Sequence, residues 1–223
     1  MTEPDDAADI SRDVADGMRG GGLSGIDPIH FPQRVGEFDH DRIVAAVHEI
    51  LIGIGEDPDR DGLKDTPKRV VDAYGEWFDG YDADVEKELS RTFEDVQGYD
   101  DMVMLRGIEV QSHCEHHMAP FLGKAWVAYM PTGKVVGLSK LARVVEIFAK
   151  RLQTQETMTM QVADAIEDHL SAAGVAVLID AEHQCMSTRG VRHQHVDTVT
   201  TTFTGVFKTD AELRSRFMGL AKA

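Results

Sequence analysis

The order of strand-like and helix-like segments in the second half of the chain constrains the fold most. β-Rich segments cover residues 101–111, 123–131, 174–186 and 197–207, and amphipathic helical segments cover 139–152 and 158–170. Two β-rich segments therefore precede the pair of helices, and two follow it. Because consecutive strands with short connections pair antiparallel, the pattern predicts an α+β fold: a four-stranded antiparallel sheet with two helices on one face.

Both helical segments repeat apolar residues at every third or fourth position, which places these residues on one side of a helix. In the segment 174–186, alternate residues from Val175 to Cys185 share one face of a strand. We expect these faces to form the core. The helical stripes are Leu141, Val144, Val145, Phe148 and Leu152 in the first helix and Met158, Val162, Ile166 and Leu170 in the second.

The chain before residue 101 divides into a tail and a helical region. Residues 1–36 are acidic and glycine-rich without apolar periodicity, which is typical of a flexible tail. Residues 37–100 are the expected N-terminal helical region, and residues 101–223 are the expected main domain.

Two helices are predicted in the N-terminal region. Asp39 is the expected N-cap of the first, and Gly55 is its expected stop. Thr66 is the expected N-cap of the second helix, with Pro67 at its first position.

Charge and composition exclude several classes of function. The chain has 223 residues and a formal net charge of −16, which argues against a nucleic-acid or anionic-membrane surface. No stretch approaches the roughly 20 apolar residues of a membrane helix. The acidic N-terminus lacks the apolar region of a secretory signal, so we expect a cytoplasmic protein. In a reducing cytoplasm, its two cysteines favour metal binding, thiol chemistry or core packing over a disulfide.

The stretch "SHCEHHMAP" contains one of these two cysteines and three histidines. Cys114 and His117 stand three residues apart, a spacing that lets both converge on one ion from a turn. Adding Cys185 gives two thiolates and one imidazole, a soft set suited to zinc. Three protein ligands leave a fourth position for water, as in catalytic sites. His116 and His183 then remain as acid/base groups.

Other readings of these residues stay open on spacing alone. Either cysteine could be a small buried hydrophobe, the two could form a disulfide, or one could serve a Cys–His thiol hydrolase. A zinc finger is excluded because the chain has no C-x₂-C pair. The "HCE" triplet fits the H-x-E of zinc nucleoside deaminases, but their P-C-x-x-C partner is absent.

Taken together, the motifs resemble the GTP cyclohydrolase I family. They are "SHCEHHMAPFLGKAWVAYMP", "GLSKLARVVEIFAKRLQTQE" and "AEHQCMSTRG", with weaker matches at "DTPKRV" and "TTTFTGVF". The resemblance runs from about residue 40 to the C-terminus. It implies the tunnelling fold, or T-fold, with residues 101–223 as the catalytic domain. It also implies pentameric rings stacked in pairs as a decamer, which would cover exposed sheet edges.

The resemblance implies a role for each matching residue. The Zn²⁺ ligands are Cys114, His117 and Cys185, the catalytic residues are His116, His183 and Ser139, and the GTP-binding residues are Leu138, Lys140, Arg143, Gln155, Glu156, Arg189 and Arg69. A carboxylate at the base can accept from the guanine N1–H and amine, which would reject adenine.

The implied reaction hydrolyses GTP to 7,8-dihydroneopterin triphosphate and formate, the first step of tetrahydrofolate or tetrahydrobiopterin biosynthesis. His183 would act as acid at N7 while the imidazole ring opens at C8, and a second hydrolysis would release C8 as formate. His116 and Ser139 would then move protons during ribose opening and rearrangement.

The chain departs from the family pattern at a few positions, and rival functions remain. Thr154 replaces an aliphatic residue, Asp72 stands where some members have lysine, and His193 and His195 lie in a variable segment. The rivals are a T-fold nitrile reductase of queuosine synthesis, a cyclohydrolase that stops after ring opening, and a metal-binding protein without turnover. The nitrile reductase would not need the Cys-His-Cys set.

Overall fold

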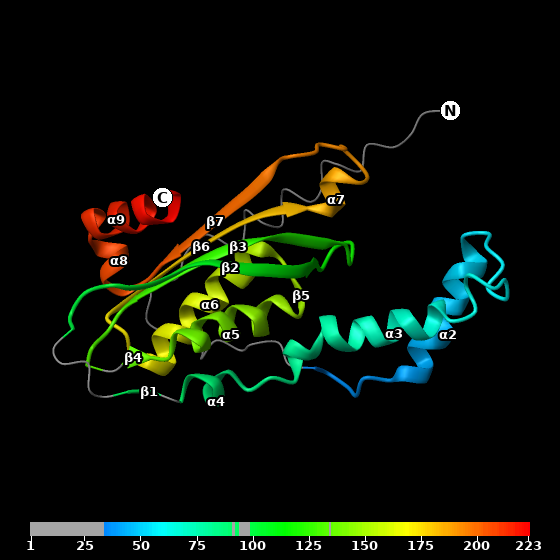
Figure 1. The fold of residues 1–223 in the computed structure, drawn as a ribbon, viewed down its shortest axis with the longest axis horizontal. Helices are drawn as coiled ribbons and strands as arrows, with labels where there is room; N and C mark the ends of the chain where they lie inside the picture. Colours follow the sequence, from blue (N-terminus) through cyan, green and yellow to red (C-terminus); the bar gives the residue numbers. More distant parts are fainter. Residues whose placement is uncertain (1–33, 91, 94–98, 134) are drawn as a thin grey trace, which may run out of the picture. The chain divides into compact units, whose positions relative to one another are not determined.

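The structure of the protein, a computed structural model, describes residues 34–90, 92–93, 99–133 and 135–223 (Figure 1). They belong to one compact unit, Phe31–Ala223. The predicted tail over residues 1–36 lies outside the described residues except for its last three. The division into a helical region and a catalytic domain stays a prediction.

The eight predicted helices and strands follow one another in the predicted order, and shorter elements and two C-terminal helices are added to them. The first part contains α2 (His40–Gly53), α3 (Thr66–Trp77), the 3₁₀ helix η1 (Asp79–Tyr81), α4 (Val85–Leu89) and β1 (Thr92–Phe93). The middle contains β2 (Val103–Cys114), β3 (Pro120–Met130), β4 (Val135–Val136), α5 (Leu138–Ala149), β5 (Leu152–Gln153) and α6 (Gln155–Leu170). The last part contains β6 (Gly174–His183), α7 (Gln184–Ser187), β7 (Asp197–Phe203), α8 (Gly205–Thr209) and α9 (Ala211–Lys222).

The main sheet has the strand order β5-β2-β3-β6-β7. Strands β2, β3, β6 and β7 pair antiparallel, so the predicted four-stranded antiparallel sheet is confirmed. The helix predicted over 139–152 is wrong at its end, because α5 stops at Ala149 and Leu152 begins the two-residue strand β5. This strand was not expected, and it adds a parallel pairing at His113–Leu152 and Cys114–Gln153. Strands β1 and β4 form a separate antiparallel pair.

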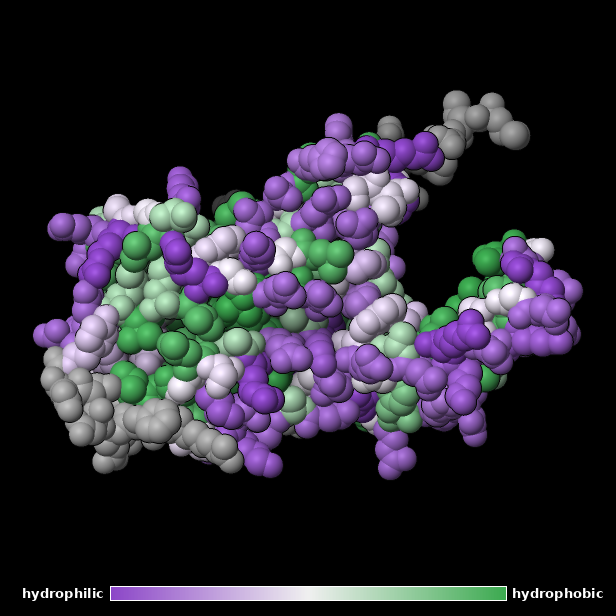
Figure 2. All heavy atoms as spheres, viewed as in Figure 1, coloured by the Kyte–Doolittle hydropathy of each residue, from purple (hydrophilic) through white to green (hydrophobic). Residues whose placement is uncertain are grey.

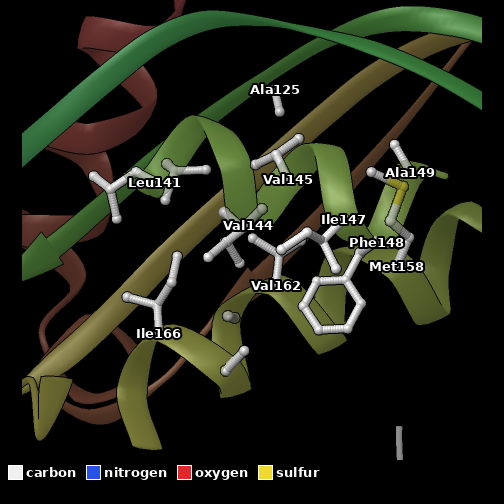
Figure 3. Close-up of a cluster of buried hydrophobic side chains, with 14 of the residues drawn as sticks. Ala125, Leu141, Val144, Val145, Ile147, Phe148, Ala149, Met158, Val162 and Ile166 are labelled. Carbon is white, nitrogen blue, oxygen red and sulfur yellow. The ribbon is translucent and has the colours of Figure 1, made fainter. Parts of the chain in front are cut away.

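Helices α5 and α6 cover one face of this sheet, as predicted (Figure 1). Figure 3 shows Val144 and Phe148 of α5 on the side of the helix that faces Val162 and Ile166 of α6, and Val145 on the side nearer Ala125 of β3. The alternate residues of β6 predicted to face this core are buried there: Val175, Val177, Ile179 and Ala181. Burial of these side chains supplies most of the driving force that holds the two helices on the sheet.

Helices α8 and α9 pack against a second buried cluster and were not predicted. That cluster includes Ala176 and Leu178, which belong to the alternate face of β6, together with Phe207 and Phe217. The predicted strand 197–207 is wrong beyond Phe203, because the chain turns at Gly205. This glycine has φ +46°, and an added Cβ would lie 2.0 Å from the Ala173 carbonyl oxygen.

The N-terminal helices agree with prediction to within one residue. The Asp39 side chain accepts a hydrogen bond from the Arg42 N–H at 3.0 Å, which confirms the cap of α2. Gly55, with φ +87°, follows the end of that helix. The N-cap of α3 is Asp65 rather than Thr66.

No helix among the described residues is long and apolar enough to cross a membrane.

Candidate metal centre

Cys114 ends β2 and begins a tight turn. Its carbonyl oxygen accepts from the N–H groups of Met118 at 2.8 Å and His117 at 3.3 Å, and its own N–H donates to Ala119 at 2.8 Å. Met118 takes the left-handed conformation with φ 52°, which closes the turn. The Glu115 N–H donates to Gln153 of β5, so this short strand holds the turn in place.

Cys185 approaches the same turn from the short helix α7, which follows β6. The predicted strand over 174–186 is wrong at its end, because β6 stops at His183 and Cys185 lies in the helical turn α7. The Thr188 N–H closes this turn by donating to the Gln184 carbonyl at 3.0 Å. Helix α7 contacts strand β3, and Cys185 packs against the main core cluster.

The three predicted metal ligands come together. One ligand atom each from Cys114, His117 and Cys185 lies within 4.8 Å of the other two. The Cys114 Sγ and His117 Nδ1 atoms are 3.8 Å apart, close to the roughly 3.5 Å between ligand atoms of a tetrahedral zinc site. Two thiols and an imidazole are the donor set that zinc prefers, so the residues fit this ion.

The protein surroundings disfavour two free thiolates at this point. Burial raises the pKa of the Cys185 thiol, and the neighbouring Cys114 raises it further. Cys114 itself is buried. A bound cation would reverse this balance, because it stabilises the deprotonated sulfur atoms.

His116 and Arg189 lie at the edge of the cluster. The Nδ1 atom of His116 is 3.6 Å from Cys114 Sγ, and its ring is exposed. Arg189 donates from Nη1 to His117 Nε2 at 3.0 Å. Both residues are therefore brought to the candidate metal centre, while their catalytic and substrate-binding roles stay predictions.

His183 is held by two contacts. Its ring stacks on Phe121 with centroids 4.6 Å apart and planes 10° apart, and its Nε2 atom is 2.9 Å from Gln155 Oε1. Burial lowers the pKa of His183, and the charge of Glu156 partly opposes this.

The surroundings of Gln155 determine which ring nitrogen of His183 carries the proton. The amide nitrogen of Gln155 donates to two backbone carbonyls, Thr198 at 2.7 Å and Ile179 at 3.1 Å, and lies 3.1 Å from Thr200 Oγ1. Since these carbonyls can only accept, the amide oxygen must face His183. Neutral His183 therefore carries its proton on Nε2, and Nδ1 is left as the acceptor.

This geometry separates two residues that were predicted to read guanine together. Gln155 is 1% exposed, and its amide is already engaged inside the protein. Glu156 is exposed in the first turn of α6, where its carboxylate can reach a ligand. The sequence offered no signal for the internal role of Gln155, because its partners lie on β6 and β7.

The structure does not bring the remaining predicted residues to the metal centre. Helix α5 has 12 residues, about 17 Å at 1.5 Å per residue. Its last residues lead into β5, which pairs with Cys114, so its first turn lies at the opposite end (Figure 1). That turn carries Leu138, Ser139 and Lys140, and Arg143 follows one turn later.

Arg69 is also separate from the metal centre. It pairs with Asp65 on the exposed side of α3 at 3.2 Å. The contact of α3 with the sheet is instead made by Trp77, whose ring stacks on His113 with centroids 4.7 Å apart. Arg69 lies eight positions before Trp77, about 12 Å along the helix.

Residues of α3, β2 and α5 line a cavity of about 630 Å³, and none of the three candidate ligands is among its lining residues. Its lining includes Trp77, Ser112, His113 and Met118. Ser112 Oγ and His113 Nδ1 are buried and have no hydrogen-bond partner among the described residues. None of the predicted site residues lines this cavity.

Comparison with known proteins places the chain among related sequences. A family model described as GTP cyclohydrolase I matches residues 43–222. The GTP cyclohydrolase 1 of Hyphomonas neptunium is 69% identical over 175 residues, covering 78% of this chain and 85% of that protein. The GTP cyclohydrolase 1 of Maricaulis maris is 65% identical over 176 residues, covering 79% and 86%. A solved archaeosine synthase QueF-like structure matches 47% of this chain and 93% of its own, with TM-score 0.39 and 15% identity.

Proposed function

The chain belongs to the GTP cyclohydrolase I family, and we propose that it hydrolyses GTP to 7,8-dihydroneopterin triphosphate and formate. The observation that carries the proposal is the meeting of Cys114, His117 and Cys185 at one point, with His116 beside them. The family also accounts for the T-fold: an antiparallel sheet with α5 and α6 on one face. We assign the reaction to the first step of tetrahydrofolate or tetrahydrobiopterin biosynthesis.

Cys114, His117 and Cys185 would hold the Zn²⁺ ion. When bound there, zinc would supply a water that ionises near neutral pH, because three protein ligands leave one position open. The protein's own contribution is to hold both sulfur atoms and the imidazole on rigid elements: the end of β2 and the turn α7.

His183 would move the proton at the purine N7 through its Nδ1 atom. Gln155 keeps Nε2–H engaged, so Nδ1 is the atom left to accept and return a proton. Phe121 holds the ring plane by stacking. His116 is exposed next to the metal ligands, where it can exchange protons with the opened ribose.

Guanine recognition is assigned mainly to Glu156. Its exposed carboxylate can accept from the N1–H and the exocyclic amine of guanine, a donor pair that adenine lacks. Gln155 would contribute by orienting His183 rather than by contacting the base, since its amide is buried.

The phosphate and ribose groups would be bound by a neighbouring subunit. Leu138, Ser139, Lys140 and Arg143 cannot meet the metal ligands of their own chain, because α5 separates them by its length. A second copy that presents its α5 to this metal centre would complete the site. Arg189 would add a cation from the same subunit as the metal ligands, and Arg69 from α3 of another copy.

The sheet supports such an assembly. Among the described strands, β2 has an outer partner only at His113 and Cys114, and β7 has none on its outer side. Two open antiparallel edges can pair between copies and close a ring. Figure 2 shows hydrophobic surface in the region of the sheet and mostly hydrophilic residues over α2 and α3. We propose a decamer of two stacked pentamers in the cytoplasm, where the thiols stay reduced, without a nucleic-acid or membrane partner.

Incubation of the zinc-replete protein with GTP tests the proposal, with formate and dihydroneopterin absorbance followed together. Equal amounts of both products, abolished in Cys185→Ala, are expected. Formate without pterin would instead indicate a reaction that stops after hydrolysis and would direct attention to His116 and Ser139. Stoichiometric zinc without either product would favour a metal-binding protein and contradict the enzymatic assignment.

A further inference from the structure

The carboxylate of Glu88 on α4 contacts two cations of α5. Its Oε2 atom is 2.6 Å from Lys140 Nζ and 3.8 Å from Arg143 Nε. The side chains of Lys140 and Glu88 are 17% and 27% exposed, so water and salt screen this pair less than a fully exposed pair.

The position of α4 does not depend on this charge. Val85 and Leu89, on the same short helix, are buried in the main core. Upstream, the Gly80 carbonyl accepts two hydrogen bonds from the Arg151 guanidinium at 2.8 and 3.1 Å. Apolar burial and the hydrogen bonds from Arg151 to the Gly80 backbone therefore hold the segment against α5.

We propose that Glu88 sets the affinity of the enzyme for polyphosphate by competing with the triphosphate for Lys140 and Arg143. This inference rests on the proposed function, which places these two cations at the triphosphate. The Glu88 carboxylate offsets part of the positive charge of Lys140 and Arg143, and removal of its charge would raise the positive charge that these two residues present to a ligand. Since Coulomb attraction grows with ligand charge, Glu88 weakens binding of a triphosphate more than binding of a monophosphate.

Weaker binding of the triphosphate has an advantage in the proposed reaction. The triphosphate is the same in GTP and in 7,8-dihydroneopterin triphosphate, so its contacts stabilise substrate, transition state and product equally. Such uniform binding does not accelerate the chemical step, and it slows release of the product. Glu88 therefore limits the binding that does not contribute to catalysis.

The variant Glu88→Gln tests the proposal, because it removes the charge and keeps an oxygen that can accept from Lys140. We expect the KM for GTP and the inhibition constant of the product to fall by the same factor, about three- to tenfold at low ionic strength. Added salt should shrink this factor. By calorimetry, the Kd of inorganic tripolyphosphate should fall similarly, and that of orthophosphate should fall less.

Asp79→Asn is the matched control, because it removes one negative charge from the same segment at the other end of α5. Asp79 pairs with Lys150 at 3.1 Å, and its removal should leave both constants unchanged. An unchanged or higher tripolyphosphate Kd in Glu88→Gln would overturn the proposal, as would an equal fall in Asp79→Asn. If the wild type makes no product from GTP, the proposed function fails, and the tripolyphosphate comparison still decides whether Glu88 opposes polyphosphate.

Discussion

Gln155 and His183 show how one buried amide can orient a reacting group. The amide is fixed by two carbonyl oxygens from β6 and β7, and it in turn selects the proton position on His183. Removal of such a group leaves buried acceptors without donors, which costs about 1–3 kcal/mol each. A substitution at a second buried glutamine that does not contact His183 separates the loss of activity from the loss of stability.

In Gln155→Met we expect kcat to fall by at least about tenfold, because His183 loses the acceptor that orients it, and the free energy of unfolding to fall by about 1–3 kcal/mol. Steady-state kinetics and urea unfolding measure the two effects. Gln161→Met is the control: Gln161 accepts from Gln153 at 2.9 Å and does not contact His183. It should lose similar stability and keep its kcat. Equal kcat losses in both variants would contradict an orienting role.

Asp164 on α6 predicts a pH dependence of stability. Burial raises the pKa of this carboxyl group to about 6, with the nearby charges of Asp168 and Glu167 adding to the shift. The folded state therefore holds the proton more tightly than the unfolded state, whose pKa is 3.8. The stability that the protonated Asp164 contributes to the folded state is fully present below pH 4 and is lost as the pH rises through about 6.

In Asp164→Asn the free energy of unfolding at pH 7 should rise by about 1 kcal/mol, after allowance for solvent screening of a half-exposed group. The difference from the wild type should vanish as the pH falls toward 4. Urea unfolding between pH 4 and 7 measures both. A constant difference across this range would mean that Asp164 titrates normally.

Among the elements, the C-terminal helices form the layer that was not anticipated. Asp210 caps α9 by accepting from the N–H groups of Glu212 and Leu213, and Phe217 packs edge-on against Phe203 and Phe207. Arg216 also pairs with Asp101, just before β2, through two contacts of 2.7 Å. The helix therefore covers the sheet face opposite to α5 and α6.

Phe217→Ala should lower the free energy of unfolding by about 3–5 kcal/mol, because it leaves a large cavity in the second core cluster. Chemical denaturation measures the loss. Leu220→Ala is the control on the same helix: Leu220 is 39% exposed, so the change should cost less than about 1 kcal/mol. Similar losses of stability in both variants would show that Phe217 does not anchor α9 on the sheet.

At the scale of the whole molecule, the separation of Lys140 from Cys185 makes a shared site testable. Cys185→Ala and Lys140→Ala should each be inactive when assembled alone. If one subunit supplies the metal ligands and its neighbour supplies Lys140, mixed assemblies contain some intact sites. Random assembly of equal amounts should restore about a quarter of the activity, measured after the two variants are dissociated and reassembled together. Two inactive variants that stay inactive after mixing would place the whole site within one chain.

The sequence by itself determined the order of the long strands and helices from α2 to β7, the core faces of α5, α6 and β6, and the set Cys114, His117 and Cys185. Each follows from a local period or from ligand chemistry, both of which are readable without knowing which distant residues meet. Only the tertiary structure decided that α8 and α9 cover the second face, that Gln155 serves His183, and that Lys140 pairs with Glu88 far from the metal ligands. These facts depend on distances between residues remote in the chain, which packing sets and local patterns do not contain.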